Sequence, residues 1–190
     1  MVVLGLGNPG EEFAATRHNV GADVVRLLAQ LHGDARFKQE KSNRALVATV
    51  RLGESRAVLA IPTTYMNESG SAARPLLKHY GAGRIERLVV VHDELDLPVG
   101  SVKLKAGGGT AGHNGLKSVQ AHLHSAEFVR VRVGIGKPTS ARSGADYVLA
   151  RPTRSERELI DVAMRDAADA VELTCEQGLN VAMNRFNGER

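Results

Sequence analysis

Leu88-Val89-Val90-Val91 is a run of four apolar residues, and a polar tail, His92-Asp93-Glu94, follows it directly. An uninterrupted apolar run of this length is typical of a strand buried on both faces in the centre of a sheet. In α/β sheets, functional side chains gather where the strands end. Asp93, which lies at the end of this strand, is therefore a candidate functional residue.

Strand and helix patterns alternate on both sides of this run. Strands are predicted over residues 2–6, 45–50, 56–61, 101–105 and 128–135, with a hairpin joining the second and third. Helical patterns cover 22–32, 69–80 and 116–123, and a last helix runs from a capping box near Thr153 to about Gln177. This alternation predicts an α/β fold with a mixed sheet, in a single domain over residues 1–190.

The composition narrows the class of protein. With 43% hydrophobic and 24% charged residues, the chain of 190 residues has the balance of one globular domain. Trp is absent and aromatic residues are few, which argues against RNA binding on a stacked aromatic sheet. The single Cys175 excludes a disulfide framework and a Cys-rich zinc site. The N-terminal residues show no signal peptide, and we expect a cytoplasmic protein.

Positive charge is concentrated in one part of the chain. The net charge is 25 − 21 = +4, but residues 101–142 contain seven Lys or Arg and one acid, Glu127. Lys103 and Lys105, like Arg130 and Arg132, stand two residues apart and so share one face of a strand. An ordinary solvated face would explain this pattern, but beside a Gly-rich loop we favour a face that binds phosphate, with nucleic acid as the partner.

The segment Gly5-Leu6-Gly7-Asn8-Pro9-Gly10 fits the G-x-G-x-x-G pattern of dinucleotide-binding proteins. Pro9 removes a backbone N–H where a pyrophosphate needs donors, and no acidic residue ends a second strand about 20 residues on. An enzyme with a nicotinamide or flavin cofactor is therefore the weaker interpretation. We favour a rigid turn that presents the Asn8 side chain, and we predict no cofactor.

His18 is the candidate base. A lone His is usually a surface or capping residue, but Asp93 could fix the tautomer of this imidazole and raise its basicity, as in His–Asp hydrolases. Asn67 and Asn114 precede predicted helices, where each is either an N-cap or an amide that recognises a peptide backbone. The chain has no H-E-x-x-H, no Cys cluster and no G-x-S-x-G, so we predict neither a catalytic metal nor a Ser nucleophile. The polar loop over 137–145 is a predicted lid.

Six motifs in one order resemble the bacterial peptidyl-tRNA hydrolase family over nearly the whole chain. They are Gly5-Leu6-Gly7-Asn8-Pro9-Gly10, Thr16-Arg17-His18-Asn19, Tyr65-Met66-Asn67-Glu68-Ser69-Gly70, His92-Asp93-Glu94-Leu95-Asp96-Leu97-Pro98, Gly112-His113-Asn114-Gly115-Leu116-Lys117 and Arg132-Val133-Gly134-Ile135-Gly136. Each motif is weak alone, but the order and spacing of all six are specific. Two departures from the family are Ala111 in place of the usual Gly and Tyr65 where Phe is commoner.

The resemblance implies a monomer with a twisted mixed sheet surrounded by helices, and hydrolysis of the ester between a peptide and the terminal ribose of tRNA. It assigns catalysis to His18 with its partner Asp93, and places Asn8 and Asn114 at water and substrate. The substrate-binding positions that it implies are Tyr65, Met66, Asn67, His113 and Asn114. Lys105 and Arg132 match the family's clamp for the tRNA 5′-phosphate. The alternative is a noncatalytic relative that binds tRNA without cleaving it.

Overall fold

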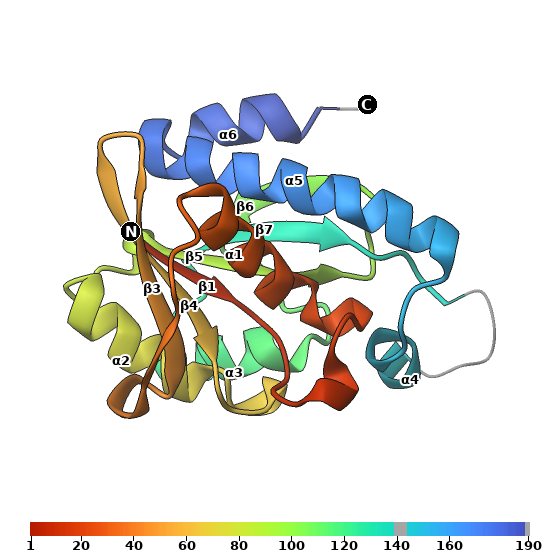
Figure 1. The fold of residues 1–190 in the computed structure, drawn as a ribbon, viewed down its shortest axis with the longest axis horizontal. Coiled ribbons are helices and arrows are strands. Elements are labelled where there is room, and N and C mark those ends of the chain that lie inside the picture. The colour runs from red at the N-terminus through yellow and green to blue at the C-terminus, as the bar shows by residue number, and fades with distance from the viewer. Residues whose placement is uncertain (139–143, 189–190) are drawn as a thin grey trace.

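The computed structural model describes residues 1–138 and 144–188, and these form a seven-stranded sheet with the strand order β2-β3-β4-β1-β5-β7-β6 (Figure 1). The strands are β1 (Val2–Gly5), β2 (Lys38–Glu40), β3 (Ala45–Leu52), β4 (Ser55–Pro62), β5 (Leu88–Glu94), β6 (Val102–Ala106) and β7 (Val129–Gly134). The central strands β4, β1, β5 and β7 run parallel, whereas β2, β3 and β6 are antiparallel to their neighbours. The predicted mixed sheet is confirmed.

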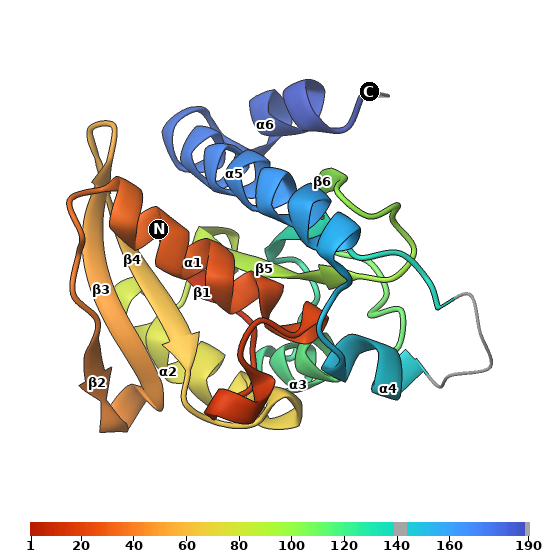
Figure 2. The same cartoon turned by 45° about the vertical axis from the view of Figure 1, so that its right-hand side comes forward.

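Helices cover both faces of the sheet (Figure 1). On one face lie α1 (Val20–Leu31), α5 (Arg154–Gln177) and α6 (Leu179–Phe186), and on the other lie α2 (Gly70–Tyr80) and α3 (Asn114–Leu123). A short helix, α4 (Gly144–Leu149), lies beside the N-terminal segment that precedes α1 (Figure 2). None of the described helices is long and apolar enough to cross a lipid bilayer.

Strand β5 is buried along its whole length and separates two hydrophobic cores. Val89 and Val91 belong to the core under α1 and α5, whereas Leu88 and Val90 belong to the core over α2 and α3. A strand that alternates between two buried faces needs an apolar residue at each position, which explains the run of four. The predicted central strand is confirmed, and it extends through Asp93 to Glu94.

Two glycines let α1 approach the sheet closely. A Cβ on Gly21 would lie 2.2 Å from the carbonyl oxygen of Val91, and one on Gly5 would lie 2.3 Å from the carbonyl oxygen of Gly21. Such distances exclude any side chain at either position. The close approach brings the residues just before α1, including His18, over the carboxyl end of β5.

Three parts of the chain differ from their predictions. Strand β2 and helix α6 were not predicted, because three polar residues and a short helix after Gly178 carry weak patterns. Helix α2, by contrast, matches the helical pattern predicted over 69–80 and contains Pro75. Of the predicted lid over 137–145, residues 139–143 lie outside the described residues, and Gly144 and Ala145 belong to α4 rather than to a loop.

The outer edge of the sheet is closed by a side chain. Among the residues that the structure describes, strand β6 has a neighbouring strand on one side only. Asn187, just after α6, accepts a hydrogen bond from the backbone N–H of Leu104 through Oδ1 (2.7 Å) and donates one to its carbonyl oxygen through Nδ2 (2.9 Å). The amide thus pairs with β6 as a neighbouring strand would at that residue.

Candidate active site

A cavity of about 270 Å³ opens at the carboxyl ends of the parallel strands. Four of the predicted site residues line it: His18, Asp93, His113 and Asn114. Glu94 and Leu95 complete the side of β5, and α4 supplies Gly144, Ala145 and Val148. The structure therefore brings together residues up to 130 positions apart in the sequence, from His18 to Val148. Loops that follow parallel strands meet in this way at the carboxyl edge of a sheet.

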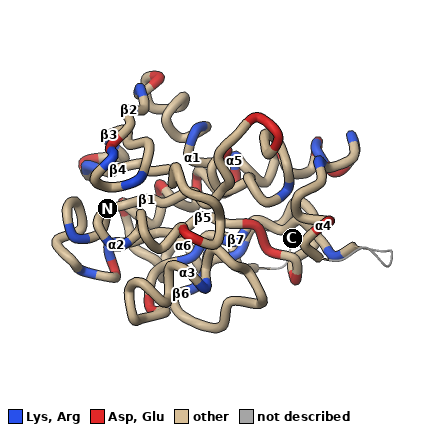
Figure 3. The backbone as a smooth tube through the Cα atoms, turned by 90° about the horizontal axis from the view of Figure 1, so that it is seen from below, with Lys and Arg blue, Asp and Glu red and all other residues tan. Residues whose placement is uncertain are grey.

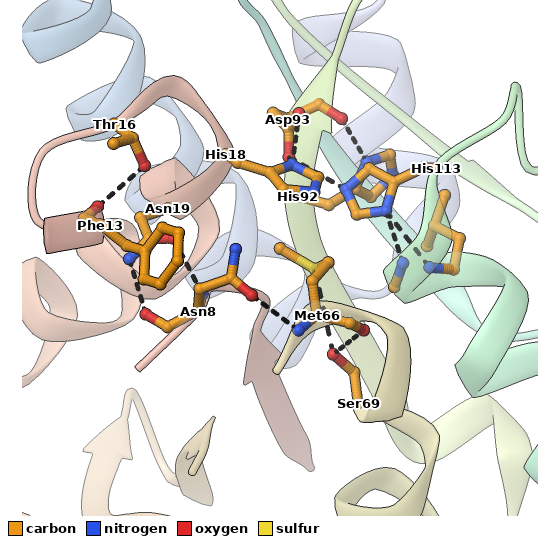
Figure 4. A network of polar contacts seen from close by, with 12 residues as sticks. Asn8, Phe13, Thr16, His18, Asn19, Met66, Ser69, His92, Asp93 and His113 are labelled. Carbon is orange, nitrogen blue, oxygen red and sulfur yellow. Dashed lines mark hydrogen bonds and ion pairs between the residues drawn. The ribbon is translucent and has the colours of Figure 1, made fainter. Parts of the chain in front are cut away.

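The Asp93 carboxylate holds two imidazoles (Figure 4). Nδ1 of His18 lies 2.9 Å from Oδ1 and 3.0 Å from Oδ2, and Nε2 of His113 lies 2.9 Å from Oδ1. Burial alone would raise the pKa of Asp93, but electrostatic interactions and hydrogen bonds with the two histidines outweigh it and lower the pKa below its ordinary value. Asp93 is therefore an ionised acceptor, and both histidine nitrogens donate to it.

The start of α3 fixes the tautomer of His113. Its Nδ1 accepts hydrogen bonds from the backbone N–H groups of Gly115 (3.1 Å) and Leu116 (3.3 Å), so His113 is the N-cap of this helix. A nitrogen that accepts carries no proton, which places the proton on Nε2, facing Asp93. Because His18 likewise donates from Nδ1, the lone pair of His18 is on Nε2 and is available to a base mechanism.

These proton positions oppose metal binding at the same side chains. Ligand atoms of His18, Asp93 and His113 all lie within 4.8 Å of one another, close enough to suggest a metal site. A metal needs an unprotonated nitrogen, whereas both nitrogens that face Asp93 carry a proton. If the proton of His113 moved to Nδ1, it would face the backbone N–H groups of Gly115 and Leu116, which now donate to that nitrogen. In the hydrogen-bonding pattern of this structure, the two histidine nitrogens therefore serve Asp93 as donors.

His92 is a buried neighbour of the cluster that the sequence analysis left without a role. Its Nδ1 donates to the carbonyl oxygen of Asp93 (2.7 Å), while Nε2 is buried without a hydrogen-bond partner among the described residues. Burial first, and then the electrostatic interaction with the neighbouring His113, lower the pKa of His92 to about 3. His92 is therefore a neutral, buried side chain in the lining of the cavity, and its ring meets that of His113 edge to face.

Asn8 is held on both its backbone and its side chain (Figure 4). The side chain of Asn19 accepts from the N–H of Asn8 (2.8 Å) and donates to its carbonyl oxygen (2.9 Å). Oδ1 of Asn8 accepts from the N–H of Met66 (2.8 Å), so its Nδ2 is left to donate elsewhere. The turn thus presents the Asn8 side chain, as predicted. The backbone N–H of Asn8, which a dinucleotide pyrophosphate would need as a donor, already binds the Asn19 side chain.

The remaining predicted substrate-binding residues do not line the cavity. Tyr65 is 57% exposed, and its ring meets that of Phe13 edge to face at 6.3 Å. Asn67 is exposed, whereas Met66 is buried. In Figure 4, His18 lies between Asp93 above and Asn8 and Met66 below. In this view, Asp93 on the one hand and Asn8 and Met66 on the other therefore lie on different sides of the imidazole.

Basic residues occur along β6 and β7, where the tube in Figure 3 is coloured blue. They alternate with the apolar residues of each strand, which puts them on one face of the sheet. In the antiparallel register, Lys103 pairs with Arg132 and Lys105 with Arg130, so Lys105 and Arg132 are diagonal neighbours. Burial first, and then the charges of Arg132 and Arg130, lower the pKa of Lys105. Arg132 lies 3.8 Å from Glu94, which also lines the cavity. Cations held this close favour a bound anion.

Arg130 has a different use from its neighbours. It is 1% exposed, and its two terminal nitrogens donate to the carbonyl oxygens of Gly109 and Gly108, each at 2.7 Å. It therefore fixes the Gly-rich loop instead of facing solvent. The sequence analysis placed Arg130 with Arg132 on a phosphate-binding face, and for Arg130 this expectation is wrong because its guanidinium is buried against the loop. Asn19 was quoted there only as part of a motif, and its role in holding the backbone of Asn8 was not predicted.

These features define an α/β protein with a buried His–Asp pair in a cavity at the carboxyl ends of its parallel strands, an arrangement compatible with general-base chemistry. Comparison with known proteins gives the family: the family model described as peptidyl-tRNA hydrolase matches residues 2–190. The chain belongs to the peptidyl-tRNA hydrolase family.

Two curated relatives support this assignment. A peptidyl-tRNA hydrolase of Mycolicibacterium vanbaalenii is 50% identical over 97% of this chain and 95% of its own length, and one of Mycobacterium marinum is 49% identical over 98% and 97%. The crystal structure of peptidyl-tRNA hydrolase from Acinetobacter baumannii superimposes with a TM-score of 0.92 at 36% identity, covering 100% of this chain and 95% of that one. The predicted resemblance and fold are thereby confirmed.

Proposed function

We propose that this member of the peptidyl-tRNA hydrolase family cleaves the ester between a peptide, or an N-acyl-amino acid, and the terminal ribose of tRNA, with His18 as the general base. The observation that carries this proposal is the pair of contacts from Nδ1 of His18 to Asp93, at 2.9 and 3.0 Å. They direct the proton to Nδ1 and the lone pair to Nε2, in a cavity wide enough for the ester.

The reaction that this geometry supports uses water as the nucleophile. Nε2 of His18 takes a proton from the water while the water oxygen bonds to the ester carbonyl carbon. Asp93 stabilises the imidazolium that forms, as a carboxylate does for a protonated histidine. The carbon–oxygen bond to the ribose then breaks, and the proton passes from His18 to the leaving oxygen. Free tRNA and the peptide acid are the products.

Amide side chains complete the machinery. Nδ2 of Asn8 is the donor that remains once Met66 has occupied Oδ1, so we assign it to the substrate carbonyl oxygen, where negative charge develops in the transition state. Asn114, the first residue of α3, lines the cavity and positions water and substrate. Both side chains are neutral, so neither changes the charge of the imidazole.

Recognition of the acyl group falls to Asn67 and Asn114, with Tyr65, Met66 and His113 as further substrate-binding residues. Asn67 is exposed and offers a donor and an acceptor to a peptide backbone. A protonated α-amine of an unacylated aminoacyl-tRNA would be desolvated against these neutral amides without a carboxylate to pair with it. We therefore assign cleavage to N-acylated substrates.

Lys105 and Arg132 are assigned to the 5′-phosphate of tRNA. Both stand on the face shared by β6 and β7, beside the Gly-rich loop, and their mutual repulsion is relieved by an anion. Arg offers a phosphate two hydrogen bonds, whereas Lys acts as a point charge. We propose that the enzyme works as a single-domain monomer in the cytoplasm, where translation supplies its substrate, and needs no metal or cofactor.

The decisive experiment is incubation of the purified protein with N-acetyl-aminoacyl-tRNA, followed by measurement of the released N-acetyl-amino acid. Release should be rapid, and the matched aminoacyl-tRNA with an unmodified amine should be spared. Binding of the tRNA without release would assign the chain to the noncatalytic relatives. Equal rates on the two substrates would contradict the assignment of Asn67 and Asn114 to recognition of the acyl group. The variant Asn67→Ala should discriminate less between the acylated and the unacylated substrate.

A further inference from the structure

Arg17, directly before His18, is a buried cation whose side-chain hydrogen bonds all reach one distant segment. It is 5% exposed. Nη1 donates to the carbonyl oxygens of Tyr147 (3.3 Å), Ala150 (3.1 Å) and Arg151 (3.1 Å). These carbonyls belong to the last turn of α4 and to the residues after it, where a helix leaves carbonyl groups without partners of its own.

The other guanidinium nitrogen ties the same side chain to the start of α5. Nη2 lies 2.7 Å from Oε2 of Glu156, which also accepts from the backbone N–H and the hydroxyl of Thr153 at 2.7 and 2.8 Å. Burial would raise the pKa of Glu156, but the hydrogen bonds from Thr153 and the charge of Arg17 lower it. Arg17 therefore meets a carboxylate that the capping box of α5 already holds in place.

The ring of Tyr147 completes this cluster. The guanidinium carbon of Arg17 lies 4.1 Å from the ring centroid, and the Tyr147 hydroxyl donates to the carbonyl oxygen of Ile135, just after β7, at 2.7 Å. One side chain on α4 thus contacts both Arg17 and the sheet. We call Arg17, Tyr147 and Glu156 the arginine hub.

The hub lies next to one wall of the cavity. Helix α4 contributes Gly144, Ala145 and Val148 to the lining, and His18 contributes from the segment of Arg17. The backbone N–H of Arg17 also donates to the carbonyl oxygen of Ala150 (3.2 Å). The position of α4 relative to the imidazole is therefore set through Arg17, the residue beside that imidazole.

We propose that Arg17 is a positioning residue that holds the α4 wall in register with His18, and so orients the acyl part of the substrate for attack. This inference rests on the proposed function. A buried ion pair contributes little net stability compared with apolar packing, so stability alone does not account for Arg17 and Glu156 at this place. A planar guanidinium that reaches three carbonyls and a carboxylate fixes an orientation that a Lys ammonium does not.

Loosening the hub should lower kcat and leave KM nearly unchanged. The tRNA contacts assigned to Lys105 and Arg132 lie on β6 and β7 and not on α4, so they should survive. Misplacement of a reacting group by about 1 Å can reduce a rate on the order of 100-fold. We expect Arg17→Lys to lower kcat by about 10- to 100-fold, and more for N-acetylglycyl-tRNA than for a bulky N-acyl-leucyl-tRNA, because a large acyl group fills the widened cavity.

The test compares Arg17→Lys, Glu156→Gln and the double variant with the wild type on both substrates, at concentrations of folded protein determined by urea unfolding. Glu156→Gln keeps an oxygen for Thr153 and removes only the charge. The loss of kcat in the double variant should be smaller than the product of the losses in the two single variants, since both changes weaken the same contact between Arg17 and Glu156. The matched control is Arg154→Lys, in an exposed pair with Glu158 on the same helix, which should behave as wild type.

Two results would overturn the inference and are distinguishable. If the wild type cleaves both substrates and the hub variants keep wild-type kcat per folded molecule, or lose activity only by a rise in KM, Arg17 is structural and the proposed function stands. If the wild type itself releases no acyl amino acid, the proposed function fails and the inference fails with it. A variant that does not fold is replaced by Tyr147→Phe, which removes the bond to Ile135 and should show the same dependence on acyl size.

Discussion

Nδ1 of His18 lies 2.9 Å from one carboxylate oxygen of Asp93 and 3.0 Å from the other, so one N–H is shared by both oxygens. This arrangement holds the plane of the imidazole as well as its tautomer. An Asn at position 93 would offer an oxygen on one side only, and its NH2 group would face an N–H of His18 or of His113.

Removal of the imidazole should abolish most activity. We expect His18→Ala to lower kcat by about 10²–10⁴-fold, the usual range for general-base catalysis, and Asp93→Asn to lower it less because the base remains. Steady-state kinetics on N-acetyl-aminoacyl-tRNA, with tRNA affinity measured separately, provide the check. His79→Gln, at an exposed histidine on α2, is the control. A near wild-type rate for His18→Ala would rule out the mechanism.

His113 has two separable contacts, a helix cap and a hydrogen bond to Asp93. His113→Asn keeps an acceptor for the start of α3, whereas His113→Leu removes it, so the Leu variant should be about 1 kcal/mol less stable than the Asn variant. Both variants lack the imidazole N–H that donates to Asp93. They should lower kcat equally, by less than about tenfold, since His18 keeps its hydrogen bonds to Asp93. Urea unfolding and kinetics measure the two effects, and equal stabilities would contradict the role of His113 as the cap.

Acid should destabilise the fold through His92. Its pKa is lowered to about 3 by burial, whereas in the unfolded chain it is near 6.5. Between these values the unfolded state binds a proton that the folded state does not, so the free energy of unfolding falls as the pH falls from 6.5 toward 3. His92→Gln should make this slope shallower by up to about 1.4 kcal/mol per pH unit, as measured by urea unfolding at several pH values. Identical slopes in variant and wild type would refute the assignment.

The phosphate clamp predicts an effect that depends on the substrate. Lys105→Ala and Arg132→Ala should raise KM for a complete N-acetyl-aminoacyl-tRNA and reduce its salt dependence, but should hardly affect a substrate that carries only the acylated terminal nucleotide. The measurement is the ratio of KM, variant to wild type, for each substrate. Lys78→Ala, at an exposed lysine on α2, is the control. Equal ratios for both substrates would place the two residues in the acyl site instead.

Chelation should leave the activity intact. The nitrogens of His18 and His113 that face Asp93 carry protons, and the ligands of a catalytic metal must be unprotonated. EDTA should therefore have no effect on the hydrolysis rate once the tRNA is folded in a fixed concentration of monovalent salt. Loss of activity on chelation, with recovery on addition of zinc or manganese, would be incompatible with the proton arrangement.

The sequence carried enough information for the fold because the strongest patterns are those of central elements. Strand β5 and the capping box at Thr153 follow from local rules, since burial on two faces and a helix start each need particular residue types. Helix α4 does not follow from such rules. It is six residues long and depends on Arg17, more than 120 positions earlier, for its last carbonyls.

The site was predictable in part for the same reason. The pairing of His18 with Asp93 was expected, because the end of a buried strand is where a partner should lie. The hydrogen bond from His113 to Asp93 was not expected. Whether His113 caps α3 or faces solvent depends on how that helix packs, which the sequence pattern does not show. The roles of Asn19 and Arg130 were also not predicted. Both side chains bind backbone groups, and sequence patterns say little about which carbonyl oxygen a side chain reaches.

The amide of Asn187, paired with the backbone of Leu104, has a consequence for handling the protein. An unpaired strand edge can recruit the strand of another molecule, and self-association of this kind grows with concentration. Truncation before Asn187, or a fusion tag that pulls this residue off the sheet, would expose the N–H and carbonyl of Leu104. Affinity tags are therefore better placed at the other terminus, since solubility at high concentration depends on one amide at this end.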